Sequence, residues 1–183
     1  MSARVVALSH TGKPLHRIDP AAVRDALDYD HDTGVFRWRH RANVPASTNT
    51  LFAGKIAGCF DGRYLNIVID GVKYLAHRLA WAHVTGEDAP FILDHFDCDK
   101  LNNKFGNLRP ATQAENMHNG RTPITNKSGV KGVCWHAPRG KWIAQIRVNT
   151  RIAHLGYFTT IESAAAAYAA ASAKHHGVFG RVA

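Results

Sequence analysis

The spacing of apolar and polar residues predicts helices and hairpins in the first half of the chain. Asp19 followed by Pro20 is a helix-start signal, which predicts a short helix over AAVRDAL. Apolar segments on both sides of Asp32-Thr33-Gly34, and again around Asp70-Gly71, predict two β-hairpins. The segment HRLAWAHVTG predicts a helix that ends at Gly86. Between the hairpins, ANVPASTNT has the composition of a loop.

The last third of the chain has a different pattern. Three segments, KGVCWHA, KWIAQIRVN and IAHLGYF, predict a meander of three strands. The middle segment alternates apolar and polar residues, so one face can pack on a helix while the other faces solvent. That helix is predicted over TIESAAAAYAAASAKHHG, where Thr159 and Glu162 are spaced as a capping box and Gly177 follows. The fold class is therefore α+β, with hairpins first and then a three-stranded antiparallel sheet packed on one α-helix.

A polar stretch that contains Gly and Pro, GRTPITNKSG, separates these two parts. The predicted organisation is a leader over residues 1–17, a first domain over 18–119, a linker over 120–128 and a second domain over 129–183.

The distribution of charge points to a polyanionic partner. The formal net charge is +9 and the pI is about 9.8. Residues 1–115 contain 14 Lys and Arg against 13 Asp and Glu, whereas residues 116–183 contain nine against one. Nucleic acid is thus a better candidate partner than an acidic small molecule, and its binding is expected in the C-terminal part.

Cysteine content and hydropathy indicate an intracellular protein that is not secreted. Cys59, Cys98 and Cys134 are far apart, which favours neither a disulfide framework nor a zinc ribbon. No apolar run approaches the ~20 residues that span a membrane, and MSARVVALSHTGK lacks a signal-peptide core.

The segment FILDHFDCDKLNNKFGNLRPATQAENMHN carries the most specific chemical pattern. FILDH predicts a strand that ends in two polar residues, and NLRPA predicts a short returning strand. Thr112 and Glu115 are spaced as a capping box for a following helix. Two strands and a helix would thus bring Asp94, His95 and Asn116 together.

These residue types suit metal-assisted hydrolysis of a phosphodiester. Carboxylate and amide oxygens are hard donors that Mg²⁺ prefers, and phosphate oxygens and water would complete its coordination. A histidine beside such an ion can take a proton from an attacking water, because its unperturbed pKa lies near working pH.

The same segment resembles the HNH endonuclease family, in particular its phage and homing-type members. The resemblance rests on Asp94-His95, Asn102-Asn103, Asn107-Leu108-Arg109 and Glu115-Asn116. It implies a ββα-metal fold in which His95 is the general base and Asp94 and Asn116 bind a divalent metal ion, Mg²⁺ or alternatively Mn²⁺. It also implies that Asn107 holds the loop and orients His95.

Simpler interpretations exist for several of these polar residues. Asn102 and Asn103 are also typical turn residues, and that role is favoured for both. The run Asp97-Cys98-Asp99 suggests a second metal site, but Cys98 has no partner cysteine and a solvated loop is favoured. His77 lies before the catalytic strand, where a position near the phosphate and a packing or capping role are equally compatible with the sequence.

Residues 129–180 resemble the APETALA/ethylene-response-factor type of DNA-binding domain, through GVKGVCW, GKWIAQIRV, LGYF and ESAAAAYAAASAKHHG. In that family the sheet lies in the major groove. Cys134 and Ile152 stand where arginines are usual, so the family's base preference is not transferable. The positions that match DNA-facing ones are Lys131, His136, Arg139, Gln145, Arg147 and His154.

The sequence therefore predicts a metal-dependent endonuclease, of a homing or phage-associated kind, that binds double-stranded DNA through its C-terminal module. One copy of each module predicts a monomer that cuts one strand at a time, although a dimer could cut two. The main alternative is a catalytically inactive DNA-binding regulator that retains the nuclease fold. An RNA-binding or structural phage component is a further alternative.

Overall fold

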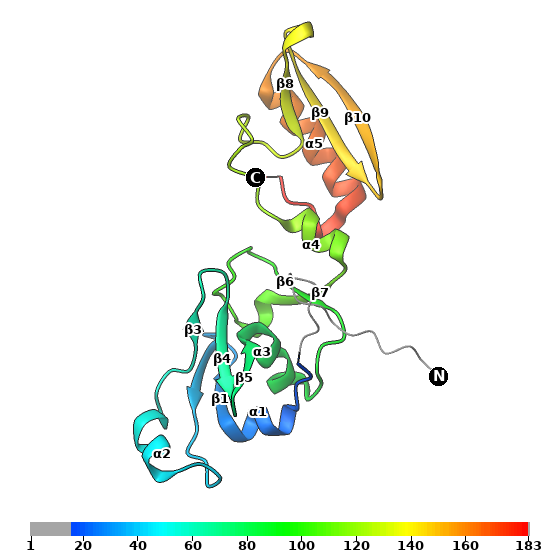
Figure 1. The fold of residues 1–183 in the computed structure, drawn as a ribbon. Coiled ribbons are helices and arrows are strands. Elements are labelled where there is room, and N and C mark those ends of the chain that lie inside the picture. Colours follow the sequence, from blue (N-terminus) through cyan, green and yellow to red (C-terminus); the bar gives the residue numbers. More distant parts are fainter. Residues whose placement is uncertain (1–15, 183) are drawn as a thin grey trace, which may run out of the picture. The chain divides into compact units, whose positions relative to one another are not determined.

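The computed structural model describes residues 16–182, so the predicted leader lies outside it except for its last two residues. The chain divides into two compact units, one that ends at Ala111 and one that begins at Thr112 (Figure 1). The predicted first domain, residues 18–119, crosses this division, because its last helix lies in the second unit. None of the described helices is long and apolar enough to cross a membrane.

The first unit is built of short helices and two- or three-stranded antiparallel sheets. Its elements are α1 (Pro20–Ala26), β1 (Leu27–Asp30), β2 (Val35–Trp38), α2 (Ala46–Phe52), β3 (Cys59–Phe60), β4 (Leu65–Ile69), β5 (Val72–Leu75), α3 (Ala76–Thr85), β6 (Ile92–His95) and β7 (Leu108–Ala111). The second unit contains α4 (Gln113–Asn119), β8 (Val133–His136), β9 (Lys141–Val148), β10 (Arg151–Phe158) and α5 (Ile161–His176).

Both predicted hairpins are present in the first unit. Strands β1 and β2 pair around Asp32-Thr33-Gly34, and Oδ1 of Asp30 accepts hydrogen bonds from the backbone N–H groups of the first two turn residues. The hairpin of β4 and β5 turns at Asp70 and Gly71, whose φ angles are 49° and 79°. Glycine adopts this left-handed backbone without strain and aspartate adopts it more easily than most residues, which is why the dipeptide predicts the turn.

The core of the first unit lies between α1, α3 and the strands of these hairpins. Helix α3 ends as predicted, with Gly86 in the left-handed conformation at φ 77°. Leu108 of β7 belongs to the same core, so the core also fixes the hairpin of β6 and β7. The largest fully buried apolar side chains of this core are Phe36, Leu27, Ile67 and Leu79.

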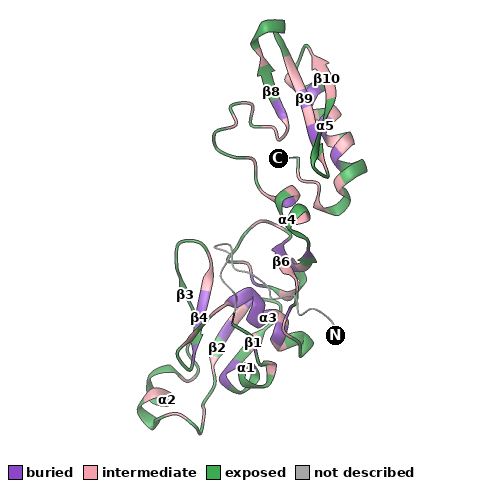
Figure 2. Ribbon diagram, turned by 45° about the vertical axis from the view of Figure 1, so that its right-hand side comes forward, coloured by how far each residue is buried: buried purple, intermediate pink, exposed green. Residues whose placement is uncertain are grey.

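The loop predicted over ANVPASTNT was wrong for its second half, where the chain forms α2. This helix has no side-chain cap at Pro45 and no buried residue (Figure 2). A preceding segment supports it, because Asn49 accepts a hydrogen bond from the backbone N–H of Arg41 and donates one to its carbonyl (3.0 and 2.7 Å). Such a contact between separate segments leaves no signal in local composition.

The second unit has the predicted three-stranded antiparallel sheet packed on α5, which confirms the α+β fold class. The strands follow the order β10-β9-β8. The alternation in β9 has the predicted result, since Ala144 and Ile146 are buried with Tyr168 of α5 while Lys141 and Arg147 are exposed. One face of the sheet is therefore covered by the helix and the other carries polar groups.

Helix α5 begins one residue later than predicted. Thr160 rather than Thr159 is the N-cap, because its backbone is extended and its side chain accepts a hydrogen bond from the N–H of Ser163 (3.2 Å). Thr159 and Glu162 have the same spacing as Thr160 and Ser163, so two caps fit the sequence and the path of the chain from β10 decides between them.

Candidate active site and DNA-binding face

Strand β6 ends in Asp94 and His95, and each of these residues is only 5% exposed. Successive side chains in a strand point to opposite faces, so the two residues need separate partners. Strand β7 pairs with β6 in a register that places Arg109 opposite Asp94 and Leu108 opposite His95. The hairpin thereby fixes the surroundings of both polar residues.

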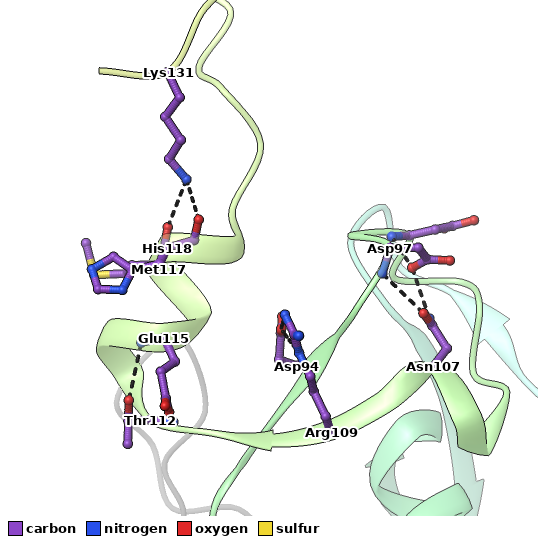
Figure 3. Close-up of polar contacts among 10 residues, drawn as sticks. Asp94, Asp97, Asn107, Arg109, Thr112, Glu115, Met117, His118 and Lys131 are labelled. Atoms are coloured by element: carbon purple, nitrogen blue, oxygen red, sulfur yellow. Dashed lines mark hydrogen bonds and ion pairs between the residues drawn. The ribbon is translucent and has the colours of Figure 1, made fainter. Parts of the chain in front are cut away.

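Arg109 is a partner of Asp94. Its Nε and Nη2 atoms both lie 2.9 Å from Oδ2 of Asp94 (Figure 3), and its guanidinium carbon lies 4.9 Å from the centre of the Phe96 ring. A buried carboxylate needs a compensating charge, so Arg109 both balances and orients Asp94. In the sequence, Arg109 stands out only as part of the motif Asn107-Leu108-Arg109, because its contact with Asp94 depends on the hairpin register.

His95 is surrounded by polar and aromatic side chains. Its Nε2 atom lies 3.5 Å from Oδ1 of Asn103, a residue that is 1% exposed. Burial lowers the pKa of His95, while Asn103 and the carboxylate of Asp97 act in the opposite direction. Because the net shift is downward, the imidazole is neutral at physiological pH, which is the form that accepts a proton.

His77, in the first turn of α3, packs against His95. Their ring centres are 5.0 Å apart at an angle of 78°. Burial, and after it the neighbouring His95, lowers the pKa of His77 to about 3. The buried, neutral ring favours the packing role over a phosphate contact.

Asn107 holds the loop that follows β6. Its Nδ2 atom donates to Oδ1 of Asp97 and to the carbonyl of Asn102, both at 2.9 Å, and the N–H of Asp97 donates to its Oδ1 at 3.2 Å (Figure 3). Desolvation raises the pKa of Asp97, but its hydrogen bonds outweigh this and the net pKa is lowered. Asn107 thus fastens the loop, whereas the amide next to the His95 ring is that of Asn103.

The buried Asn103 differs from an ordinary turn residue. Its backbone carbonyl accepts a hydrogen bond from the hydroxyl of Tyr29 (2.7 Å), and its Nδ2 atom donates to the carbonyl of Leu101 (3.1 Å). Gly34 approaches the same backbone so closely that a Cβ atom there would lie 2.6 Å from the N atom of Lys104. The loop beside His95 is therefore packed on the β1–β2 hairpin.

Asn116 lies in α4 and therefore in the second unit. The predicted capping box is confirmed, since the N–H of Glu115 donates to the Thr112 side chain and the Glu115 carboxylate accepts from the N–H of Thr112. Within residues 16–182, no group of three or more His, Cys, Asp or Glu side chains is arranged to hold a metal ion. Cys59, Cys98 and Cys134 form no disulfide bond within the described residues.

The open face of the C-terminal sheet gathers basic and aromatic groups around Tyr157. The rings of His136 and His154 lie 5.2 and 4.7 Å from its ring centre, and the guanidinium carbon of Arg139 lies 4.6 Å from it. Gln145 pairs with His154 across β9 and β10, so both belong to this face. Tyr157 was not among the predicted DNA-binding residues; its pairing with Ile143 of β9 places it on the open face.

Lys131 is placed differently from the other predicted DNA-binding residues. Its ammonium group donates hydrogen bonds to the backbone carbonyls of Met117, His118 and Gly120 at the end of α4 (3.4, 2.6 and 2.7 Å).

The region around β6 is similar to a known protein family. Residues 74–123 match the HNH endonuclease family model. The matched segment includes Asp94, His95, Asn107 and Asn116. The match ends before β8, so it does not extend to the C-terminal sheet.

A phage protein is also similar to part of the chain. Protein 3.8 of Escherichia phage T7 is 37% identical over 67 residues, which cover 36% of this chain. The aligned part spans 55% of the phage protein, so the chain covers about half of that relative. No solved structure matches the chain significantly.

Proposed function

We propose that this protein is a metal-dependent DNA endonuclease that cuts phosphodiester bonds with His95 as general base. The observation that supports this most is the arrangement of Asp94 and His95 at the end of β6, each buried and each next to a defined polar partner, inside the region that matches the HNH family. Fixed polar groups in a partly dry site are what catalysis requires.

In the proposed reaction His95 takes a proton from the water that attacks phosphorus. Its neutral imidazole can accept that proton, and Asn103 beside Nε2 and His77 beside the ring limit its movement. Asn107 acts indirectly by fastening the loop that carries Asn103. The pair of Asp94 and Arg109 keeps the end of the strand in one conformation.

Asp94 and Asn116 would hold the divalent metal ion. Both offer hard oxygen atoms, so the donor types fit Mg²⁺, with Mn²⁺ as the alternative. The ion pair with Arg109 is compatible with this role, because a carboxylate held by a guanidinium is already oriented before a metal ion binds. When bound, the ion supplies positive charge for the phosphate and the leaving oxygen.

The second unit would bind double-stranded DNA in the manner of an APETALA/ethylene-response-factor domain, with its open sheet face in the major groove. Support comes from its topology and from the basic groups on that face. Arg147 and Lys141 are exposed there, and Gln145 and His154 lie between them. Amide and guanidinium groups of this kind read base edges or bind phosphates. The homing or phage-associated setting, the intracellular location and the monomeric state belong to the same proposal.

Incubation of the purified full chain with duplex DNA, single-stranded DNA and RNA, each with and without Mg²⁺, tests the proposal. We expect Mg²⁺-dependent cleavage of the duplex that is absent from the His95→Ala variant. Duplex binding without cleavage would support a catalytically inactive DNA-binding regulator instead. A preference for RNA would support an RNA-binding or structural phage component. Mapping the products on a random-sequence library would then identify the target and show whether one or both strands are cut.

A further inference from the structure

Helix α4, which carries Asn116, depends on contacts outside itself. It has only seven residues, and isolated helices shorter than about 12 residues are marginal in water. The capping box of Thr112 and Glu115 satisfies N–H groups at its start. At its end the N–H of the C-cap Gly120 donates to the carbonyls of Asn116 and Met117 (3.2 and 3.3 Å), and the next carbonyl, that of His118, needs a partner outside the helix.

Lys131 supplies that partner. An ammonium group has three hydrogen-bond donors, and three backbone carbonyls at the end of α4, those of Met117, His118 and Gly120, accept hydrogen bonds from it. Figure 3 shows the side chain extended toward this end of the helix. A positive charge at a helix C-terminus also interacts favourably with the helix dipole. The ammonium group is therefore occupied by the protein's own backbone, in contrast to the exposed guanidinium of Arg147.

A second contact fixes α4 within the same unit. The ring of His118 stacks on that of His176, with centres 3.6 Å apart and planes at 13°. His176, in the last turn of α5, also has its Nε2 atom 2.8 Å from the carbonyl oxygen of Arg147 in β9. Two independent contacts, one from the segment before β8 and one from α5, thus connect the helix of Asn116 to the rest of the C-terminal unit.

We infer that Lys131 is a positioning residue for the nuclease reaction, which acts through Asn116 by anchoring α4 on the C-terminal unit. This inference rests on the proposed function, and it replaces the expectation that Lys131 contacts DNA. It means that the C-terminal unit does more than bind the substrate, because it also orders the helix with one of the two proposed metal ligands.

Substitution of Lys131 in the full chain tests the inference. In Lys131→Met the three hydrogen bonds are lost, in Lys131→Arg donors are retained, and Lys127→Met removes the same charge from an exposed residue of the same segment. For each variant we would measure kcat and KM on duplex DNA, the Mg²⁺ concentration for half-maximal rate, the Kd for duplex DNA in EDTA, and the thermal unfolding curve.

We expect Lys131→Met to lower kcat by about 10- to 100-fold and to raise the Mg²⁺ requirement, as when a residue that orients a metal ligand is removed. The Kd for DNA should change no more than in Lys127→Met, and Lys131→Arg should recover most of the rate. A direct DNA contact gives the opposite pattern, with a weaker Kd, a higher KM and an unchanged kcat at saturating DNA. That pattern would overturn the inference, as would full activity of Lys131→Met.

His176→Ala provides a second variant in case Lys131→Met unfolds. It removes the stack on His118 and leaves Lys131 in place, so it should also reduce kcat and raise the Mg²⁺ requirement while duplex affinity persists. An unchanged rate and Mg²⁺ requirement in this variant would count against anchoring of α4. If the native protein itself does not cut DNA, the proposed function fails; if it cuts and both variants cut equally well, only the role of Lys131 fails.

Discussion

The end of β6 and the open face of the C-terminal sheet expose their polar groups to very different degrees. Asp94 and His95 are each 5% exposed and lie against Arg109 and Asn103, whereas Arg147 is exposed on β9. Buried groups with fixed partners keep one geometry, which suits a chemical step. Exposed cations keep their charge available to a polyanion. Changes at the first region should therefore lower the rate of cleavage, and changes at the second should lower affinity.

Removal of divalent ions should have the largest effect on cleavage, and it should distinguish the function of the β6 region from that of the open sheet face. We expect EDTA to stop cleavage, because Asp94 and Asn116 are the proposed ligands of the ion, while duplex binding by the sheet persists. Plasmid cleavage and fluorescence anisotropy of a labelled duplex would be followed in EDTA and after Mg²⁺ or Mn²⁺ is added back. Undiminished cleavage in EDTA would exclude the metal from the mechanism, and loss of binding would show that the two regions are not separable.

His95→Ala should reduce the cleavage rate by about 10²- to 10⁴-fold, the usual contribution of a general base, and leave the Kd for DNA unchanged. Single-turnover cleavage at saturating protein measures the first quantity and anisotropy the second. His40→Ala, at an exposed histidine, is the matched control and should cut normally. A fully active His95→Ala variant would disprove the assignment.

Arg147→Ala should weaken duplex binding by about 1–3 kcal/mol and relax the preference at one base pair, if its guanidinium reads a base edge. A uniform loss over all sequences would make it a phosphate contact instead, with a salt dependence lower by roughly 0.9 in log Kd per log salt unit. Arg151→Ala is the control, because Arg151 pairs with Val148 and shares the face that packs on α5. Equal effects of the two substitutions would refute a specific role for the open face.

The smallest expected effect concerns the stability of the second unit. Thr160→Ala should lower the free energy of unfolding by about 1 kcal/mol, since it removes the N-cap of α5. Thr159→Ala should cost clearly less, and neither substitution should change the cleavage rate at saturating DNA and at temperatures well below unfolding. Chemical denaturation followed by circular dichroism measures both variants. A larger loss in Thr159→Ala would contradict the cap that the structure places at Thr160.

Local patterns in the sequence determined much of the fold. The turn at Asp70-Gly71, the end of α3 at Gly86, the capping box at Thr112 and the alternation along β9 all depend on a few neighbouring residues, and each was predicted. The motif around Asp94-His95 could also be recognised, because several polar residue types stand in it at fixed spacing. Such signals depend on residues that are close together in the chain, so they can be recognised from the sequence alone.

Tertiary structure decided which partners these residues have. The pairing of Arg109 with Asp94, the position of Asn103 beside His95 and the anchoring of α4 by Lys131 join residues that are 15, 8 and 11 to 14 positions apart. Strand register and loop path set each of these contacts, and neither is encoded in the residue types alone. The sequence thus identified the polar residues of the candidate site, and the fold decided which side chains hold them in place.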